Sequence, residues 1–285
     1  MLEARATALA SRSIKTTTKR VGIDLAIACV DLTTLEGRDS AGRVRSLCIR
    51  AMHPDPSDAT VPHVGAVCVY PNLVAVARET LGTSAVHLAS VATAFPSGQA
   101  EMSVKLADTE QALAAGADEI DMVIDRGAFL EGNDRKVATE IEAIKELCHG
   151  RAHLKVILET GELGSYENIR RASDLALHAG ADTIKTSTGK IGTNATLPTA
   201  LLMCEAIRDF ADRTGELRGL KVAGGVRTTK QALAYLVVVN ETLGADWLTP
   251  DRFRIGASSL LDDLLMQRQK ERSGRYAGND YISKD

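Results

Sequence analysis

The sequence lacks the features that mark membrane and secreted proteins. No apolar run approaches the ~18 consecutive residues that a membrane-spanning helix needs, and the first residues contain no apolar segment typical of a secretory signal. The five cysteines are odd in number and scattered, without C-x-x-C spacing, which argues against a disulfide framework or a zinc site. We therefore predict reduced thiols, a cytoplasmic location and no metal.

A strong excess of either charge is also missing. The formal net charge is −3 and the isoelectric point is about 6.1. These values exclude the broad basic surface of a protein that binds nucleic acid or coats an anionic membrane. We expect neither kind of partner, whereas small anions remain compatible with local basic clusters.

No Pro-rich or Ser-rich linker divides the chain, so a single domain is expected. Residues 1–20 are rich in Arg, Lys, Ser and Thr, with Glu3 as their one acidic residue. This composition resembles an organellar transit peptide as well as an ordinary N-terminal arm, and we favour an arm or helical extension that precedes the barrel. Residues 271–285 are polar and predict a surface tail, which leaves residues 21–270 for the domain.

Short apolar segments alternate with longer amphipathic ones along residues 21–270. The amphipathic segments have apolar residues at steps of three and four, and a Gly closes the pattern at Gly116 and Gly180, as at a helix end. Strict alternation of strand and helix predicts parallel strands with right-handed crossovers. Eight such units fit a closed (β/α)8 TIM barrel of the α/β class better than an open doubly wound sheet. The predicted strands are residues 27–35, 65–71, 88–96, 119–125, 154–160, 182–189, 220–225 and 253–259.

Two lysines occupy matching places near the ends of neighbouring predicted strands, Lys185 in "DTIKTSTG" and Lys221 in "LKVAGG". Strand side chains alternate, so both lysines can point into the barrel and lie ~5–6 Å apart. Their repulsion, together with desolvation, would lower the pKa of one amine enough to make it a nucleophile that forms a Schiff base with a carbonyl carbon. The structural alternative is that each long side chain reaches out to solvent.

Carboxylates fall at the same end of the predicted barrel. Asp121 lies between apolar residues of its strand and needs a partner, which could be Lys155 in a structural salt bridge. Its functional interpretation is proton transfer during Schiff-base chemistry, and both roles can hold. Asp31 ends the first strand and could reach the Lys221 side of the pocket.

Glycine-rich returns follow the last three predicted strands and predict a phosphate site. Glycine lets backbone N–H groups approach an anion, and the last two loops of a TIM barrel are the usual phosphate cradle. A nucleotide P-loop is excluded: its pattern needs Gly at the position of Ile184 and Ser or Thr at the position of Ile191. The predicted substrate-binding residues are Asp31, Thr33, Lys155, Thr186, Gly189, Lys190, Gly224, Gly225, Gly256, Ser258 and Ser259.

The motifs "DLTTL", "VCVYP", "ADEIDMVI", "LKVILETGEL", "GADTIKTSTGK", "KVAGGVRT" and "RIGASSLL" resemble the deoxyribose-phosphate aldolase family in order and spacing, from about Asp24 to Tyr276. The resemblance implies reversible cleavage of 2-deoxy-D-ribose 5-phosphate to acetaldehyde and D-glyceraldehyde 3-phosphate, with no metal or organic cofactor. It also implies that Lys185 forms the Schiff base, Lys221 lowers its pKa, and Asp121 moves protons with an ordered water.

Some positions depart from the family pattern. Val222 replaces a common proline, "TAFPSG" replaces a common Asn-Phe-Pro-His-Gly, and neither Tyr276 nor Tyr281 is terminal, where some members have a tyrosine that assists proton transfer. Cys68 matches a common cysteine and is interpreted as a small core residue. Two alternatives stay open: a Schiff-base aldolase for larger sugar phosphates, and a silent phosphosugar-binding barrel. A homodimer is compatible with the sequence, which does not fix the assembly.

Overall fold

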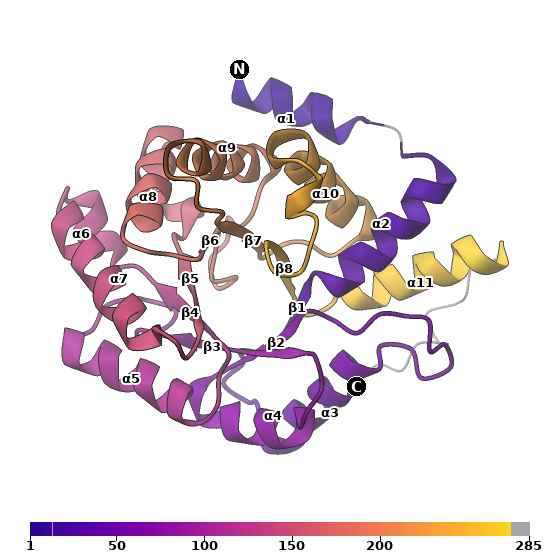
Figure 1. Ribbon diagram of the computed structural model, residues 1–285, viewed down its shortest axis with the longest axis horizontal. Helices are drawn as coiled ribbons and strands as arrows, with labels where there is room; N and C mark the ends of the chain where they lie inside the picture. The colour runs from indigo at the N-terminus through magenta and orange to yellow at the C-terminus, as the bar shows by residue number, and fades with distance from the viewer. Residues whose placement is uncertain (13, 275–285) are drawn as a thin grey trace.

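Eight parallel strands close into one barrel in chain order (Figure 1). The structure, a computed structural model, describes residues 1–12 and 14–274, so Tyr276 and Tyr281 lie outside the described residues. The closed barrel confirms the predicted (β/α)8 architecture. Its strands are β1 (Val30–Thr33), β2 (Ala66–Val69), β3 (His87–Ala92), β4 (Glu119–Val123), β5 (His153–Ile157), β6 (Thr183–Lys185), β7 (Gly219–Ala223) and β8 (Phe253–Ala257).

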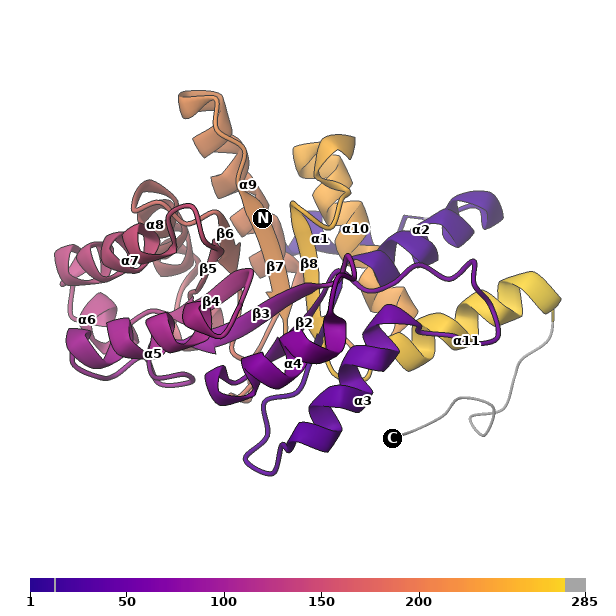
Figure 2. The same cartoon turned by 60° about the horizontal axis from the view of Figure 1, so that its bottom comes forward.

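Helices surround this barrel on the outside (Figure 2). The described α-helices are α1 (Leu2–Ala10), α2 (Thr16–Ala28), α3 (Ala41–Met52), α4 (Val74–Leu81), α5 (Met102–Ala114), α6 (Arg126–Leu130), α7 (Asp134–Cys148), α8 (Tyr166–His178), α9 (Leu197–Thr214), α10 (Thr229–Leu243) and α11 (Leu260–Ser273). Short 3-10 turns are η1 (Pro71–Leu73), η2 (Thr160–Glu162) and η3 (Ala245–Trp247). Within the described residues, no helix combines the length and apolarity needed to cross a bilayer.

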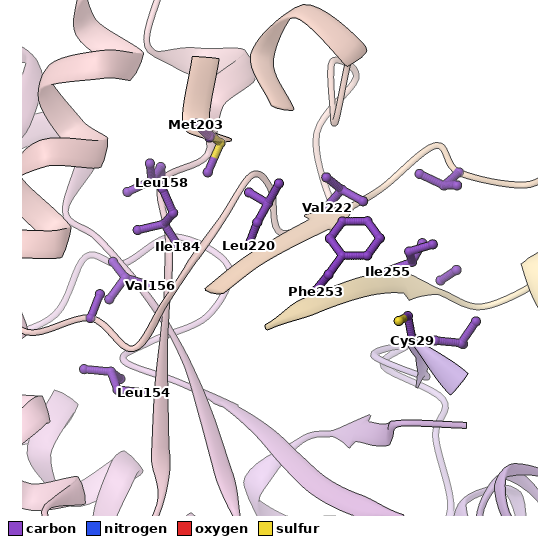
Figure 3. Close-up of a cluster of buried hydrophobic side chains, with 14 of the residues drawn as sticks. Cys29, Leu154, Val156, Leu158, Ile184, Met203, Leu220, Val222, Phe253 and Ile255 are labelled. Atoms are coloured by element: carbon purple, nitrogen blue, oxygen red, sulfur yellow. The ribbon is translucent and has the colours of Figure 1, made fainter. Parts of the chain in front are cut away.

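The strands direct alternate side chains to opposite sides of the barrel wall. Leu154, Ile184, Leu220, Val222 and Phe253 belong to the outer apolar layer (Figure 3) and are fully buried. The residues that alternate with them along each strand therefore point into the barrel, because the side-chain period of a strand is two. Burial of the outer layer, worth about 1.5–3 kcal/mol for each large apolar side chain, fixes which residues face inward.

Helix starts are fixed by capping side chains. Thr228 accepts a hydrogen bond from the backbone N–H of Gln231, whose side chain completes a capping box at the start of α10. This cap satisfies N–H groups that the first turn leaves unpaired, and it fixes the end of the glycine-rich loop after β7. Side-chain caps also begin α3, α7, α8 and α9, at Ser40, Asn133, Ser165 and Thr196.

Both terminal boundaries of the predicted domain fall inside helices. The arm predicted for residues 1–20 contains α1, which packs against α9 and α10, and the first part of α2, which packs against α10 and α11. The tail predicted from residue 271 begins within the last turn of α11. Ion pairs hold both terminal helices to the rest of the fold, as between Arg5 and Glu205 at 2.6 Å and between Arg268 and Asp24 at 2.6 Å.

The loop after β3 is held in a conformation that residues other than glycine rarely adopt. Thr93 and Ala94 have φ angles of 62° and 59°. The Thr93 hydroxyl accepts from the N–H of Val123 at 2.9 Å and donates to its carbonyl oxygen at 3.0 Å. Gly98 lies so close to the end of β4 that an added Cβ would meet the Ile124 carbonyl oxygen at 2.3 Å. Close backbone packing therefore holds this loop against the strand that carries Asp121.

The substitution Gly98→Ala is expected to lower the free energy of unfolding by about 1–3 kcal/mol more than Gly132→Ala, because its methyl group overpacks the backbone. Gly132 is the matched control: its φ is also positive, at 82°, but nothing lies within 4 Å of an added Cβ. Urea titration of both variants measures the difference. Equal losses would show that the β3 loop moves away from β4 at no cost.

Candidate active site

Seven charged side chains point into the barrel from six of its strands. Each is no more than 6% exposed. Asp31 comes from β1, Glu119 and Asp121 from β4, Lys155 from β5, Lys185 from β6, Lys221 from β7 and Arg254 from β8. Buried charges are costly unless they are paired, so the energy of this cluster depends on which of its cations and carboxylates form ion pairs.

Asp121 bridges the two lysines that the sequence pairs. Lys185 and Lys221 are directly opposite in the β6–β7 register. Both ammonium groups donate to the same Oδ2 atom of Asp121, each at 2.7 Å. Their nitrogens therefore cannot be farther apart than twice that distance, and neither lysine reaches out to solvent.

The remaining members connect to this bridge through further ion pairs. Lys155 donates to Asp121 Oδ1 at 2.9 Å and also pairs with Glu119. Lys221 pairs with Asp31, which Arg254 contacts at 2.6 Å. The structural salt bridge considered for Asp121 and Lys155 is thus present together with the lysine bridge. The contact between Asp31 and Lys221 follows from the closure of β1 against β8.

The two bridged lysines have opposite electrostatic environments. Burial lowers the pKa of Lys185; Asp121 opposes this effect, and the charge of Lys221 reinforces it, so the pKa lies below its usual value. Burial also acts against the charge of Lys221, but the carboxylates of Asp121 and Asp31 outweigh it and raise the pKa. Lys185, whose one ion pair among the described residues is with the shared Asp121, is therefore the amine that loses its proton more easily.

Asp121 itself is held as an anion. Burial alone would raise its pKa, but Lys155, Lys185 and Lys221 together keep the pKa well below its usual range. Cys68 lies near the same charges, and burial raises its pKa to about 11, which keeps the thiol neutral. Its interpretation as a small core residue is consistent with its complete burial.

A cavity of about 180 Å³ opens above Lys185 at the C-terminal ends of the strands. This is the end where TIM barrels carry reactive groups. Predicted residues that line it are Thr33, Lys185, Gly189, Lys190, Gly224, Gly225, Gly256, Ser258 and Ser259. The fold thus brings the glycine-rich returns of β6, β7 and β8 together at one rim beside the candidate nucleophile.

The rim has the local features of an anion site. Gly224 has φ 80°, and an added Cβ there would meet the side chain of Asn194 at 2.4 Å, so only glycine fits. Ser259 stands at the N-cap of α11, where the helix dipole and free N–H groups favour negative charge. Lys190 also reaches the cavity, where its ammonium group donates to Glu36 at 2.9 Å.

Three predicted substrate-binding residues do not line this cavity. The Thr186 hydroxyl accepts from the Ala223 N–H at 3.0 Å and so ties β6 to the end of β7. Asp31 is buried and belongs to the ion-pair network, through Lys221 and Arg254. Lys155 lines a different cavity, of about 250 Å³, which also contains residues from the N-terminal ends of the strands. All three make contacts within the protein interior, and their binding to a substrate stays a prediction.

Several residues that shape the site were missed in the sequence. Glu36, Thr188 and Arg227 line the cavity above Lys185, and Glu119 and Arg254 complete the interior network. A signal for the last two was present, because Glu119 lies two residues before Asp121 and Arg254 two before Gly256. Alternation of strand side chains places each of them on the inward face.

A larger groove lies between α7 and α8. That groove, of about 790 Å³, is lined by Asp134, Tyr166, Arg170, Arg171 and other helix residues, and contains none of the predicted site residues. Among residues 1–12 and 14–274, no group of three or more His, Cys, Asp or Glu side chains is arranged to hold a metal ion.

The chain is similar to known deoxyribose-phosphate aldolases. The chain is 45% identical over 278 residues to the deoxyribose-phosphate aldolase of Mus musculus, covering 94% of this chain and 87% of the relative. The Homo sapiens deoxyribose-phosphate aldolase is 43% identical with the same coverage. A solved structure of a tetrameric deoxyribose phosphate aldolase from Aeropyrum pernix is 27% identical, with a TM-score of 0.69 over 91% of this chain and 98% of that chain.

The family model described as DeoC/LacD family aldolase matches residues 25–266, which include all seven inward-facing charges and the glycine-rich rim. With this match and the extensive identity to its curated relatives, the chain belongs to the DeoC/LacD aldolase family.

Proposed function

We propose that this chain is a class I aldolase that reversibly cleaves 2-deoxy-D-ribose 5-phosphate to acetaldehyde and D-glyceraldehyde 3-phosphate, with Lys185 forming the Schiff base. The observation that carries the proposal is the bridge from Asp121 Oδ2 to both lysines, directly beneath a glycine-lined cavity. The names of the Mus musculus and Homo sapiens relatives support the choice of substrate.

The chemistry follows from an amine whose pKa is lowered by burial and by the charge of Lys221, so that it releases its proton more easily than a free lysine. Lys185 Nζ attacks C1 of the open-chain sugar, and the carbinolamine loses water to give an iminium ion. Removal of the proton from the C3 hydroxyl then breaks the C2–C3 bond, which releases D-glyceraldehyde 3-phosphate and leaves an enamine on Lys185. Protonation at C2 and hydrolysis release acetaldehyde and restore the amine.

Asp121 and Lys221 have complementary roles in this sequence. Asp121 lies 2.7 Å from Lys185 Nζ, within the range for direct proton transfer to groups attached to that nitrogen or to a water beside it. The raised pKa of Lys221, which the Asp121 and Asp31 carboxylates maintain against burial, keeps it a cation through the cycle. Lys221 therefore supplies a fixed positive charge, while Lys185 changes its protonation state.

The cavity geometry favours a short phosphorylated substrate. Its volume of about 180 Å³ suits a short sugar phosphate better than the longer sugars of the alternative aldolase hypothesis. The lowered pKa of Lys185, which burial produces and the charge of Lys221 reinforces, argues against the silent barrel, because a binding protein has no need of a free amine. We also propose a cytoplasmic enzyme and a homodimer; the tetramer is a property of the Aeropyrum pernix protein.

Reduction with borohydride in the presence of acetaldehyde is expected to add one ethyl group to Lys185, because the iminium ion is trapped as a stable amine. Peptide mass spectrometry locates the adduct. The substitution Lys185→Met is expected to abolish the adduct and lower turnover by more than about 10⁴-fold. A wild-type protein that acquires its adduct elsewhere, or nowhere, would contradict the assignment of Lys185.

The substitution Lys221→Met is expected to move the pH optimum of cleavage upward, because loss of the neighbouring cation raises the pKa of Lys185. Activity lost near neutral pH should partly return at higher pH in a steady-state pH–rate profile. Lys105→Met is the matched control: Lys105 is equally buried but pairs with Glu140 between α5 and α7, outside the barrel. An unchanged profile for Lys221→Met would reject the charge-pair account.

The substitution Lys190→Met is expected to raise KM for the phosphorylated sugar by roughly 10- to 100-fold, the loss of one charge-assisted contact. Turnover of unphosphorylated 2-deoxy-D-ribose should remain unchanged, because Lys190 lies at the rim and not beside the nucleophile. Glu36→Gln should have the opposite effect and lower KM, since it frees Lys190 from its ion pair. Equal effects of Lys190→Met on both sugars would remove Lys190 from the phosphate site.

A further inference from the structure

The barrel interior has a second opening at the end opposite the substrate cavity. This cavity of about 250 Å³ is lined by His87, Glu119, His153, Lys155 and Arg254, among others. Glu119 and Arg254 line this opening and do not line the cavity above Lys185. They are nevertheless part of the same buried network as the proposed catalytic groups.

Each of these two residues is linked to a catalytic side chain through one intermediate ion. Glu119 pairs with Lys155, and Lys155 donates to Asp121 at 2.9 Å. Arg254 contacts Asp31 at 2.6 Å, and Asp31 pairs with Lys221. Arg254 and Glu119 also contact each other at 2.9 Å, which closes the network across the barrel.

The charges of this network balance in one protonation state of Lys185. The carboxylates of Asp31, Glu119 and Asp121 equal in number the cations Lys155, Lys221 and Arg254, counted over the inward-facing residues of the described strands. A neutral Lys185 leaves the interior without net charge, whereas a protonated Lys185 leaves one excess positive charge. An excess charge in a buried, low-dielectric volume is unfavourable.

We propose that Glu119 and Arg254 are positioning residues that set the net charge of the barrel interior and thereby determine how readily Lys185 releases its proton. This inference rests on the proposed function, in which Lys185 reacts as a free amine. Removing either residue changes the interior by one charge without touching the substrate cavity, and the two removals have opposite signs.

Other titratable groups facing the pair do not change this expectation. His87 on β3 contacts Glu119 at 2.8 Å, and this hydrogen bond raises the pKa of its exposed imidazole. Burial lowers the pKa of His153 on β5, which keeps it neutral. Burial raises the pKa of Cys29, which lies beside Arg254, to about 12, so its thiol is neutral. The described fixed charges in contact with the pair are Lys155 and Asp31.

The test follows the pH dependence of acetaldehyde trapping on Lys185, with cyanoborohydride as reductant and mass spectrometry as readout. Glu119→Gln is expected to move the midpoint down by about one pH unit, and Arg254→Met to move it up by about one, for a unit charge ~8–10 Å away. In either variant the neighbours keep a partner: Lys155 keeps Asp121, and Asp31 keeps Lys221. The double variant should return to the wild-type midpoint.

Two charge-conserving controls separate this role from a packing role. Arg254→Lys should retain the wild-type midpoint, as should His153→Gln, which lines the same opening without changing a charge. Midpoints that shift in the same direction for Glu119→Gln and Arg254→Met, or not at all, would overturn the inference. A wild-type protein without any adduct at Lys185 would instead overturn the proposed function.

A second pair of variants decides the question if the buried substitutions do not fold. The side chain of His87 is 48% exposed, so that position tolerates replacement. His87→Lys places a fixed positive charge beside Glu119, and His87→Gln places none. The midpoint of His87→Lys should lie below that of His87→Gln by a few tenths of a pH unit. Equal midpoints would show that charge at this end of the barrel does not reach Lys185.

Discussion

The structure depends on one carboxylate oxygen that two buried ammonium groups share. In water such a contact would contribute little to stability. In a dry interior each charge needs a partner, and here two ammonium groups share one carboxylate oxygen. Lys221 has a second carboxylate in Asp31, whereas Lys185 has its share of Asp121 alone among its ion pairs in the described residues. This inequality makes two chemically identical amines different: one remains a cation, and the other can become a nucleophile.

The barrel provides this inequality through its geometry. Parallel strands in register place Lys185 beside Lys221, while the carboxylates reach across from β4 and from β1, which closure brings next to β8. Apolar residues on the outward side of the same strands hold the register, as Ile184 and Leu220 do next to the two lysines. The packing that stabilises the fold is therefore the same packing that keeps the charges aligned.

The two ends of the barrel differ in the residues that line them. At the C-terminal ends, the cavity above Lys185 is lined by glycine-rich backbone and lies at the start of α11; in the proposed function it holds the phosphate group while Lys185 attacks the carbonyl carbon. At the opposite end, Glu119 and Arg254 complete the charge balance. At the substrate end Glu36 pairs with Lys190, and in the proposed function the phosphate group of the substrate replaces this carboxylate.

The sequence by itself determined the alternation of strands and helices and the inward direction of Lys185 and Lys221, because these follow from local patterns with periods of two and of three to four residues. It also determined the glycine-rich returns, which are short local motifs. The identity of partners needed the closed barrel, which brings the Thr186 hydroxyl to the backbone of Ala223 and places Lys155 at the opposite opening. The contacts that hold the terminal helices also needed the fold, since ion pairs such as Arg5–Glu205 join residues far apart in the chain. Which charges meet across the interior is a property of strand order and closure, and no local pattern encodes it.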